Sequence, residues 1–210
     1  MNIERLKSHA SGRLTEIWYE DKKYLAFVPH PLPPKLSMDD MELILALSEA
    51  DRALGELAGL GRTIPNPQLL ISPFIRREAV LSSRIEGTRT DIRELYAYEA
   101  GHLPLPGATQ SRSREDAYEV RNYVLALEYG LRRLGDTPVD LNLIREVHSH
   151  LMKGVHGDRA QPGEFRTIQN WIGRGRIGGA VFVPPPVPQM TEALREYELY
   201  LQSNVDYPPL

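Results

Sequence analysis

The sequence predicts a mainly α fold, a helical bundle with one small β-hairpin. Apolar residues recur at helical spacing in long segments, most clearly over residues 37–61, 113–134 and 140–153, and capping or glycine residues mark the ends of these segments. Strand-like patterns are confined to short runs near residues 18–27 and 180–183. The fold is therefore expected to contain little β-structure.

The composition limits the classes of function. The chain has 210 residues and a net charge of −3, which gives no general attraction to nucleic acid or to an anionic membrane. It contains no cysteine, so disulfides and thiolate metal sites are excluded. No apolar run approaches the length that spans a membrane, and the first residues lack the apolar segment of a signal peptide. These features predict a cytoplasmic protein without a membrane or nucleic-acid partner.

The N-terminal part is expected to contain a short strand or hairpin and then a helix. Aromatic residues alternate over residues 18–27, and a proline-rich run follows as a rigid connector. Ser37 is the expected N-cap of the helix over residues 37–61, and acidic residues follow it at the positive end of the helix dipole.

The stretch from Ser72 to Thr88 predicts a helix over about residues 73–87. Ser72 suits the N-cap, Pro73 suits the first helical position, and Gly87 suits the left-handed position after the last turn. Glu86 is anomalous, because the helix dipole disfavours a negative charge at the carbonyl end.

Ser82 lies one turn before Glu86, within reach of its carboxylate or of the backbone. Spacing alone favours a solvated Glu86 beside a capping glycine over a functional residue, since an exposed glutamate there costs little.

The second half of the chain continues with further helices. A helix over residues 90–100 ends before a linker at residues 101–112, which is the best candidate for a domain boundary. Asp140 is the expected cap of the helix over 140–153. A metal site using Glu146 and His150 is conceivable, but the histidines lack the spacing of known helical metal motifs, and we predict no metal site.

A glycine- and proline-flanked segment precedes the last helix, expected over residues 189–201. Ala180, Val181, Phe182 and Val183 form its strand-like part. The glycines over residues 173–179 are not followed by Lys-Ser or Lys-Thr, so a phosphate-binding P-loop is rejected.

Two motifs resemble the Fic protein family. The run Ser82-x-x-x-Glu86-Gly87 resembles the family's inhibitory-helix motif, and Pro162-Gly163-Glu164-Phe165-Arg166 resembles the segment that leads into the Fic core. The resemblance covers nearly the whole chain in the family's order. It implies a Fic-type bundle with a β-hairpin flap at about residues 173–186, an N-terminal region over 1–100 that carries the inhibitory helix, and the first part of the core over 113–210.

The resemblance also implies site residues. In the family, the glutamate pairs with an arginine of the catalytic loop and blocks productive placement of the ATP γ-phosphate, which assigns autoinhibition to Glu86 with Ser82 beside it. The flap borders the adenine pocket and holds the target by main-chain bonding to its edge, a role carried over to Ala180, Val181, Phe182 and Val183. The family transfers AMP from ATP, with Mg²⁺, to a hydroxyl of a protein target. ATP and that target are therefore the expected partners, and a homo-oligomer is left open.

The family's catalytic loop is absent from the sequence. None of the six histidines precedes Pro-Phe, and no Asn-Gly-Arg occurs, so the resemblance assigns no catalytic or metal-binding residue. The chain is expected to be the N-terminal part of a Fic adenylyltransferase, inactive alone. The alternative is a stand-alone, antitoxin-like regulator that acts on a Fic enzyme in trans. The flap segment argues against this alternative, because such a regulator has no need of a flap.

Overall fold

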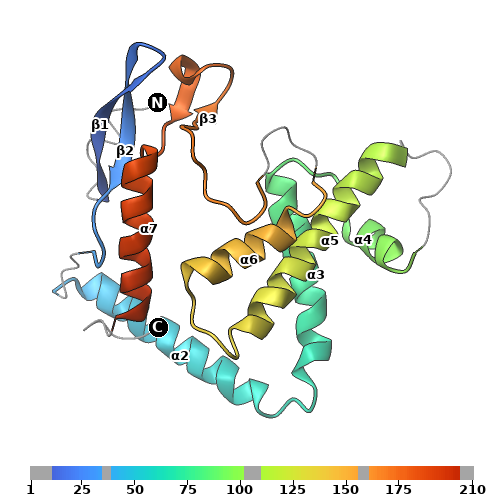
Figure 1. Cartoon of the computed structure of the whole chain (residues 1–210). Helices are drawn as coiled ribbons and strands as arrows, with labels where there is room; N and C mark the ends of the chain where they lie inside the picture. The colour runs from blue at the N-terminus through green and yellow to red at the C-terminus, as the bar shows by residue number, and fades with distance from the viewer. Residues whose placement is uncertain (1–10, 35–38, 102–109, 156–160, 204–210) are drawn as a thin grey trace. The chain divides into compact units, whose positions relative to one another are not determined.

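The computed structural model describes residues 11–34, 39–101, 110–155 and 161–203. Six α-helices and two two-stranded antiparallel sheets lie in these ranges, which confirms the predicted mainly α class (Figure 1). None of the helices in the described ranges combines the length and apolar character that crossing a bilayer requires. The chain forms two compact units, one from Met1–Ser37 with Phe165–Pro209 and the other from Met38–Glu164.

The helical unit contains α2 to α6. In chain order their bounds are α2 Met41–Gly61, α3 Pro67–Ile85, α4 Ile92–Glu99, α5 Gln110–Arg133 and α6 Leu141–Leu151. The helix α5 packs against α3, α4 and α6 (Figure 1). The core joins three of these helices and consists of Ala79, Val80, Leu95, Val120 and Val124. A salt bridge between Arg76 Nε and Glu99 (2.8 Å) also ties α3 to α4.

Two predicted helix starts are wrong. The helix α2 begins at Met41 with Asp40 as its N-cap, since Asp40 Oδ1 accepts from the amides of Glu42 (3.0 Å) and Leu43 (3.3 Å). The predicted cap, Ser37, lies outside the described residues. Aspartate and serine are equally good N-cap residues, so the sequence alone did not discriminate between Asp40 and Ser37.

The helix α3 begins at Pro67, whereas the predicted helix began at about residue 73. Pro67 occupies its first turn, and Pro73 lies inside the helix instead of starting it. Ser72 is not a cap, because its Oγ accepts from Arg76 Nη1 (2.5 Å) one turn later. The side chain of Arg76 thus binds within the turn that contains Pro73, a position that usually interrupts a helix.

The hairpin unit consists of two small sheets and α7 (Val187–Gln202). Strands β1 (Gly12–Tyr19) and β2 (Lys22–Pro29) pair along their whole length and meet in a two-residue turn at Glu20 and Asp21, both with positive φ. The second sheet pairs β3 (Ile172–Gly173) with β4 (Ala180–Phe182), and the 3₁₀ turn η1 (Ile177–Gly179) lies between them. A small core of Ala26, Ile177 and Val183 joins the two sheets.

The predicted boundary at residues 101–112 is only partly described. Gly101, with φ +73°, follows the end of α4, and residues 102–109 lie outside the described residues. The helix α5 starts at Gln110, three residues before the predicted start. The division into family regions 1–100 and 113–210 stays a prediction.

Candidate functional site

The carboxyl end of α3 forms a closed cap. The Gly87 amide donates to the Arg84 carbonyl (3.1 Å) and the Thr88 amide to the Ser83 carbonyl (3.2 Å). Gly87 has φ +106°, a conformation that glycine adopts without a Cβ clash. These two bonds are a Schellman motif, so the predicted end of the helix at Gly87 is confirmed.

Glu86 is the C-cap of α3, directly after the last helical residue Ile85, and its backbone is still right-handed with φ −80°. Its side chain is exposed, and within the described ranges its carboxylate has no bonded partner. Ser82 Oγ donates to Glu78 Oε1 (2.6 Å), away from Glu86 and the backbone, which were its two expected partners. A hydroxyl has one hydrogen to donate, so Ser82 cannot hold both carboxylates. Among the described residues, Glu86 is therefore an unpaired negative charge at the negative end of the α3 dipole.

The segment after Glu86 is bound to α5 and to α4. The Arg89 amide donates to Asp116 Oδ2 (2.8 Å) on α5. Asp91 and Glu94 form a capping box at the start of α4. Thr88 and Thr90 are buried, and in the described part of the chain their hydroxyls have no hydrogen-bond partner. These contacts fix the backbone on the carboxyl side of Glu86.

An uncovered apolar stripe runs along α3 and ends at Ile85. Phe74, Leu81 and Ile85 are 62%, 45% and 85% exposed, whereas Ala79 on the opposite face is fully buried. Large apolar side chains are costly to leave in water when they are contiguous. This stripe is suited to contact another protein segment, and Glu86, which follows Ile85 in the chain, lies by helical spacing on the Ala79 side of α3.

The predicted flap (residues 173–186) is a short hairpin with a bulge. Ile172 pairs with Phe182 and Gly173 with Ala180, so Val181 is an extra residue between the two pairs. Val181 is 65% exposed, whereas Val183, beyond the end of β4, is 3% exposed and belongs to the small core. Of the four residues predicted to form the docking strand, Val181 is therefore exposed, Val183 is buried, and Ala180 and Phe182 are half-buried.

The flap is attached to β2. The Phe27 amide donates to the Val183 carbonyl (2.9 Å), and the rings of Phe27 and Phe182 lie 6.1 Å apart. Trp171, just before β3, packs edge-on against Tyr19 of β1 with 5.9 Å between ring centroids. The N-terminal hairpin is thus part of the support of the flap, which the sequence did not indicate.

Side chains hold the proline run that leaves the flap. Prolines have no amide hydrogen, so Pro184 and Pro185 cannot donate to a strand, but their carbonyls still need donors. Arg166 Nη2 donates to the Pro185 carbonyl, and Gln169 Nε2 donates to the Pro184 carbonyl (3.1 Å). Burial lowers the pKa of Arg166, the last residue of the predicted lead-in motif. The three consecutive prolines were the sequence signal that could have predicted this arrangement.

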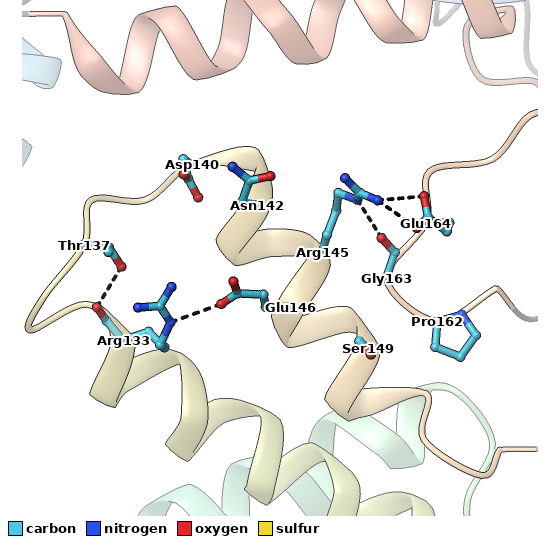
Figure 2. Close-up of a pocket in the computed structure, with 10 residues that line it drawn as sticks. All are labelled: Arg133, Thr137, Asp140, Asn142, Arg145, Glu146, Ser149, Pro162, Gly163 and Glu164. Carbon is cyan, nitrogen blue, oxygen red and sulfur yellow. Dashed lines mark hydrogen bonds and ion pairs between the residues drawn. The ribbon is translucent and has the colours of Figure 1, made fainter.

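The first part of the lead-in motif is bound to α6. The Gly163 amide donates to His148 Nδ1 (3.0 Å). The Gly163 carbonyl accepts from Arg145 Nε (2.7 Å), as Figure 2 shows. A Cβ at Gly163 would lie 3.1 Å from the Arg145 carbonyl, and its φ is +80°, so glycine is required here. Arg145 Nη2 also donates to both oxygens of Glu164 (2.7 and 2.8 Å).

A polar depression of about 490 Å³ lies beside these contacts (Figure 2). It is lined by Arg133, Thr137, Asp140, Asn142, Arg145, Glu146, Ser149, Pro162, Gly163 and Glu164. Glu146 accepts from Arg133 Nε (3.1 Å) and from Tyr129 Oη (2.8 Å), and these bonds lower the pKa of Glu146. The two arginines that line this depression are already paired, Arg133 with Glu146 and Arg145 with Glu164. Their charges are therefore neutralised, and the depression is not suited to bind an anion.

The histidines of α6 have structural contacts. His148 Nδ1 accepts from Gly163, and His150 lies against the Tyr129 ring with 4.1 Å between centroids. In the described ranges, no three His, Asp or Glu side chains lie close enough to hold a metal ion. His148 and His150 are therefore used in packing and hydrogen bonding.

Comparison with known proteins gives two findings. Residues 44–132 match the family model described as "Fic/DOC family N-terminal". A Fic family protein from Desulfovibrio desulfuricans G20 has a similar structure, with a TM-score of 0.59 and 20% sequence identity over 84% of this chain. The chain spans 49% of the length of that structure.

Proposed function

We propose that the chain is the N-terminal part of a Fic family protein adenylyltransferase, which transfers AMP from ATP to a hydroxyl of a protein target. In this proposal Glu86 holds the enzyme inactive and the flap receives the target. The chain itself supplies regulation and docking, while the reacting groups belong to the remainder of the Fic fold.

The observation that carries the proposal is the unpaired carboxylate of Glu86. It lies at the carbonyl end of α3, where its own helix repels it, and no described side chain compensates the charge. A positive partner from another segment would therefore be favourable. An arginine that binds the ATP γ-phosphate would be such a partner, and a carboxylate paired with it would keep ATP out of the reactive position.

Uncovered apolar faces support the presence of a partner segment. The helix α2 buries none of its side chains, and α3 exposes the stripe that ends at Ile85. The matched Fic structure is about twice as long as the region it shares with this chain. The remaining part of the Fic fold would cover these faces and bring its catalytic loop next to Glu86.

The part of the chain that the structure describes does not provide a binding site for the Mg²⁺ that the family uses. The described residues provide no set of three acidic or histidine ligands, and the sequence contains no loop of the His-Pro-Phe type. We therefore assign neither the Mg²⁺ site nor the general base to these residues. The 210-residue chain should transfer no AMP, which labelled ATP and a lysate of target proteins would test.

The decisive experiment uses a protein extended through the Fic catalytic loop. Its parent form, Glu86→Gly and Ser82→Ala are compared by the initial rate of AMP labelling. Glu86→Gly should label faster, because the arginine becomes free for the γ-phosphate. Ser82→Ala should have a smaller effect, because the Ser82 hydroxyl bonds to Glu78.

Glu78→Gln is the matched control, since it removes an exposed carboxylate from the same helix without changing Glu86. Its rate should equal that of the parent. If Glu86→Gly labels no faster than the parent while it folds and binds ATP, autoinhibition by Glu86 is wrong.

The exposed α3 face also suits a regulator that acts in trans. Such a regulator would present Glu86 to the arginine of a separate Fic enzyme. If the 210-residue chain inhibits a Fic enzyme that lacks its own inhibitory helix, and Glu86→Gly does not, the trans role gains support. The flap favours the first proposal, because regulation in trans does not require it.

A further inference from the structure

The segment around the flap differs in charge from the rest of the protein. Residues 165–191 contain three arginines and no aspartate, glutamate or lysine, although the whole chain has a net charge of −3. A local excess of one sign attracts ligands of the opposite sign, independently of the net charge. The flap is therefore a cationic surface on an acidic chain.

The two outer arginines of this surface are free to bind. Arg174 and Arg176 are exposed, and neither has an ion-pair partner in the part of the chain that the structure describes. Some exposed arginines do have one, such as Arg52 with Glu56 and Arg195 with Glu192, whereas Arg62 and Arg93 have none among the described residues. The third arginine of the segment, Arg166, donates to backbone carbonyls and supports the flap.

Contacts within the loop support the conformation that carries these arginines. Trp171 Nε1 donates to the Gly175 carbonyl (3.2 Å) between Arg174 and Arg176. A Cβ at Gly173 would lie 2.7 Å from the Gly179 carbonyl, so the two sides of the loop are in close contact. A preformed loop loses little conformational entropy when a ligand binds.

Apolar side chains lie next to the two charges. Ile172 and Val181 are each 65% exposed. Strand addition to such a hairpin places alternate side chains of the bound segment on opposite faces. A surface with separate cationic and apolar contacts therefore fits an extended peptide better than it fits a uniformly charged phosphate polymer.

We propose that the flap binds an extended, acidic segment of its protein partner, in which aspartate or glutamate alternates with β-branched or aromatic residues. The carboxylates would pair with Arg174 and Arg176, and the apolar residues would contact Ile172 and Val181. The identification of this segment as part of the AMP acceptor rests on the proposed function. The binding preference itself does not.

The test measures peptide affinity by fluorescence anisotropy with the 210-residue chain and without ATP. The probe is a labelled ten-residue peptide in which Asp alternates with Val around a central Thr, and the reference peptide has Asn at each Asp. The acidic peptide should bind roughly fivefold more tightly at low salt, as expected for two exposed ion pairs. The difference should fall below about twofold near 0.5 M salt, because screening weakens exposed pairs.

Two double variants locate the effect. Arg174→Gln with Arg176→Gln should abolish the preference for the acidic peptide. Arg62→Gln with Arg93→Gln removes the same charge from exposed positions on the helical unit and should preserve the preference. Equal loss in both double variants would mean that only net charge matters, and the proposal would fall.

Two further outcomes contradict the proposal. Equal affinity for the Asp and Asn peptides would overturn it. A ten-nucleotide single-stranded DNA that binds more tightly than the acidic peptide through the same arginines would also overturn it, in favour of a nucleic-acid surface. Failure of the extended protein to transfer AMP would instead refute the proposed function and leave the measured peptide preference unaffected.

Discussion

Two long helices, α2 and α5, have similar sequence patterns and opposite environments. Each carries an apolar stripe at helical spacing, over 21 and 24 residues. The stripe of α5 is in the core, where Val120 and Val124 are at most 1% exposed. The stripe of α2 is in solvent, where Leu54 and Leu57 are 50% and 67% exposed.

This difference shows what an apolar stripe means physically. A stripe indicates that a helix is stable only when something covers it, but it does not identify the covering element. The helix α5 finds its cover in α3, α4 and α6 of the same unit. The helix α2 buries no side chain against the described residues, which agrees with our proposal that further Fic segments cover it.

The largest expected effect comes from placing an aspartate in the apolar stripe of each helix and comparing the loss of stability. Val124→Asp should abolish cooperative unfolding, because an unpaired carboxylate in the core costs several kcal/mol, on the order of the stability of a domain. Leu57→Asp should change the melting temperature by no more than about 2 °C, since its site is exposed. Circular dichroism melts of both variants test this. A comparable loss in both would mean that α2 is covered in solution.

The second prediction concerns self-association of the 210-residue chain. The exposed stripe should make the chain associate and bind an apolar dye such as ANS. Leu54→Glu with Leu57→Glu should shift the chain toward monomer, and Gly55→Glu with Gly59→Glu should not, although it adds the same charge to exposed positions of α2. Light scattering after size exclusion decides this. A parent chain that is monomeric and binds no dye would show that the stripe is harmless or covered.

The sequence was informative where a local rule decides the structure. Gly87 ended α3 as predicted, because only a residue without a Cβ enters the left-handed region at no cost. Asp140 capped α6 as predicted, with its carboxylate bound to the Leu143 amide (2.7 Å). Where several residues satisfy the same rule, as at the starts of α2 and α3, the choice depends on packing that the sequence pattern does not contain.

In the candidate site, too, the sequence predicted the features that depend on local signals and missed the contacts between residues far apart in the chain. The position of Glu86 at a helix end followed from local signals, and its inhibitory role stays a prediction. Gly163 is bound by Arg145 and His148 of α6, which lie 18 and 15 positions earlier in the sequence. No rule of sequence spacing predicts contacts of this kind. Ser82 had two acceptors at equal sequence distance, Glu78 and Glu86, and only the rotamer decides between them.

The third prediction sharpens the comparison within one helix, because α3 has a buried and an exposed face. Ala79→Val should destabilise the protein by about 1–3 kcal/mol, since Ala79 is fully buried and the core has no room for two more methyl groups. Ile85→Ala should change stability by no more than about 0.5 kcal/mol, since Ile85 is 85% exposed. Urea denaturation measures both. A larger effect at Ile85 would contradict the exposed face.

The smallest expected effect is pH-dependent and lies on α5. Partial burial raises the pKa of the Glu119 carboxyl, with further contributions from the nearby charges of Asp116 and Glu115. The folded state therefore holds the Glu119 proton more tightly than the unfolded chain does, whose glutamate pKa is about 4.3. Stability from this group is full below the unfolded pKa and is lost as pH rises through the folded pKa.

Glu119→Gln should consequently raise the melting temperature at pH 7 and give a smaller gain near pH 4, where more of the parent carboxyl carries its proton. Glu119 is only partly buried, so the gain should be at most about 1 kcal/mol, or roughly 2–4 °C. Glu49→Gln is the control, because Glu49 is an exposed carboxylate on α2. Melting curves at both pH values provide the measurement. A gain of equal size at pH 4 and pH 7, or an equal gain in the control, would show that the carboxyl of Glu119 is not destabilised by its place on α5.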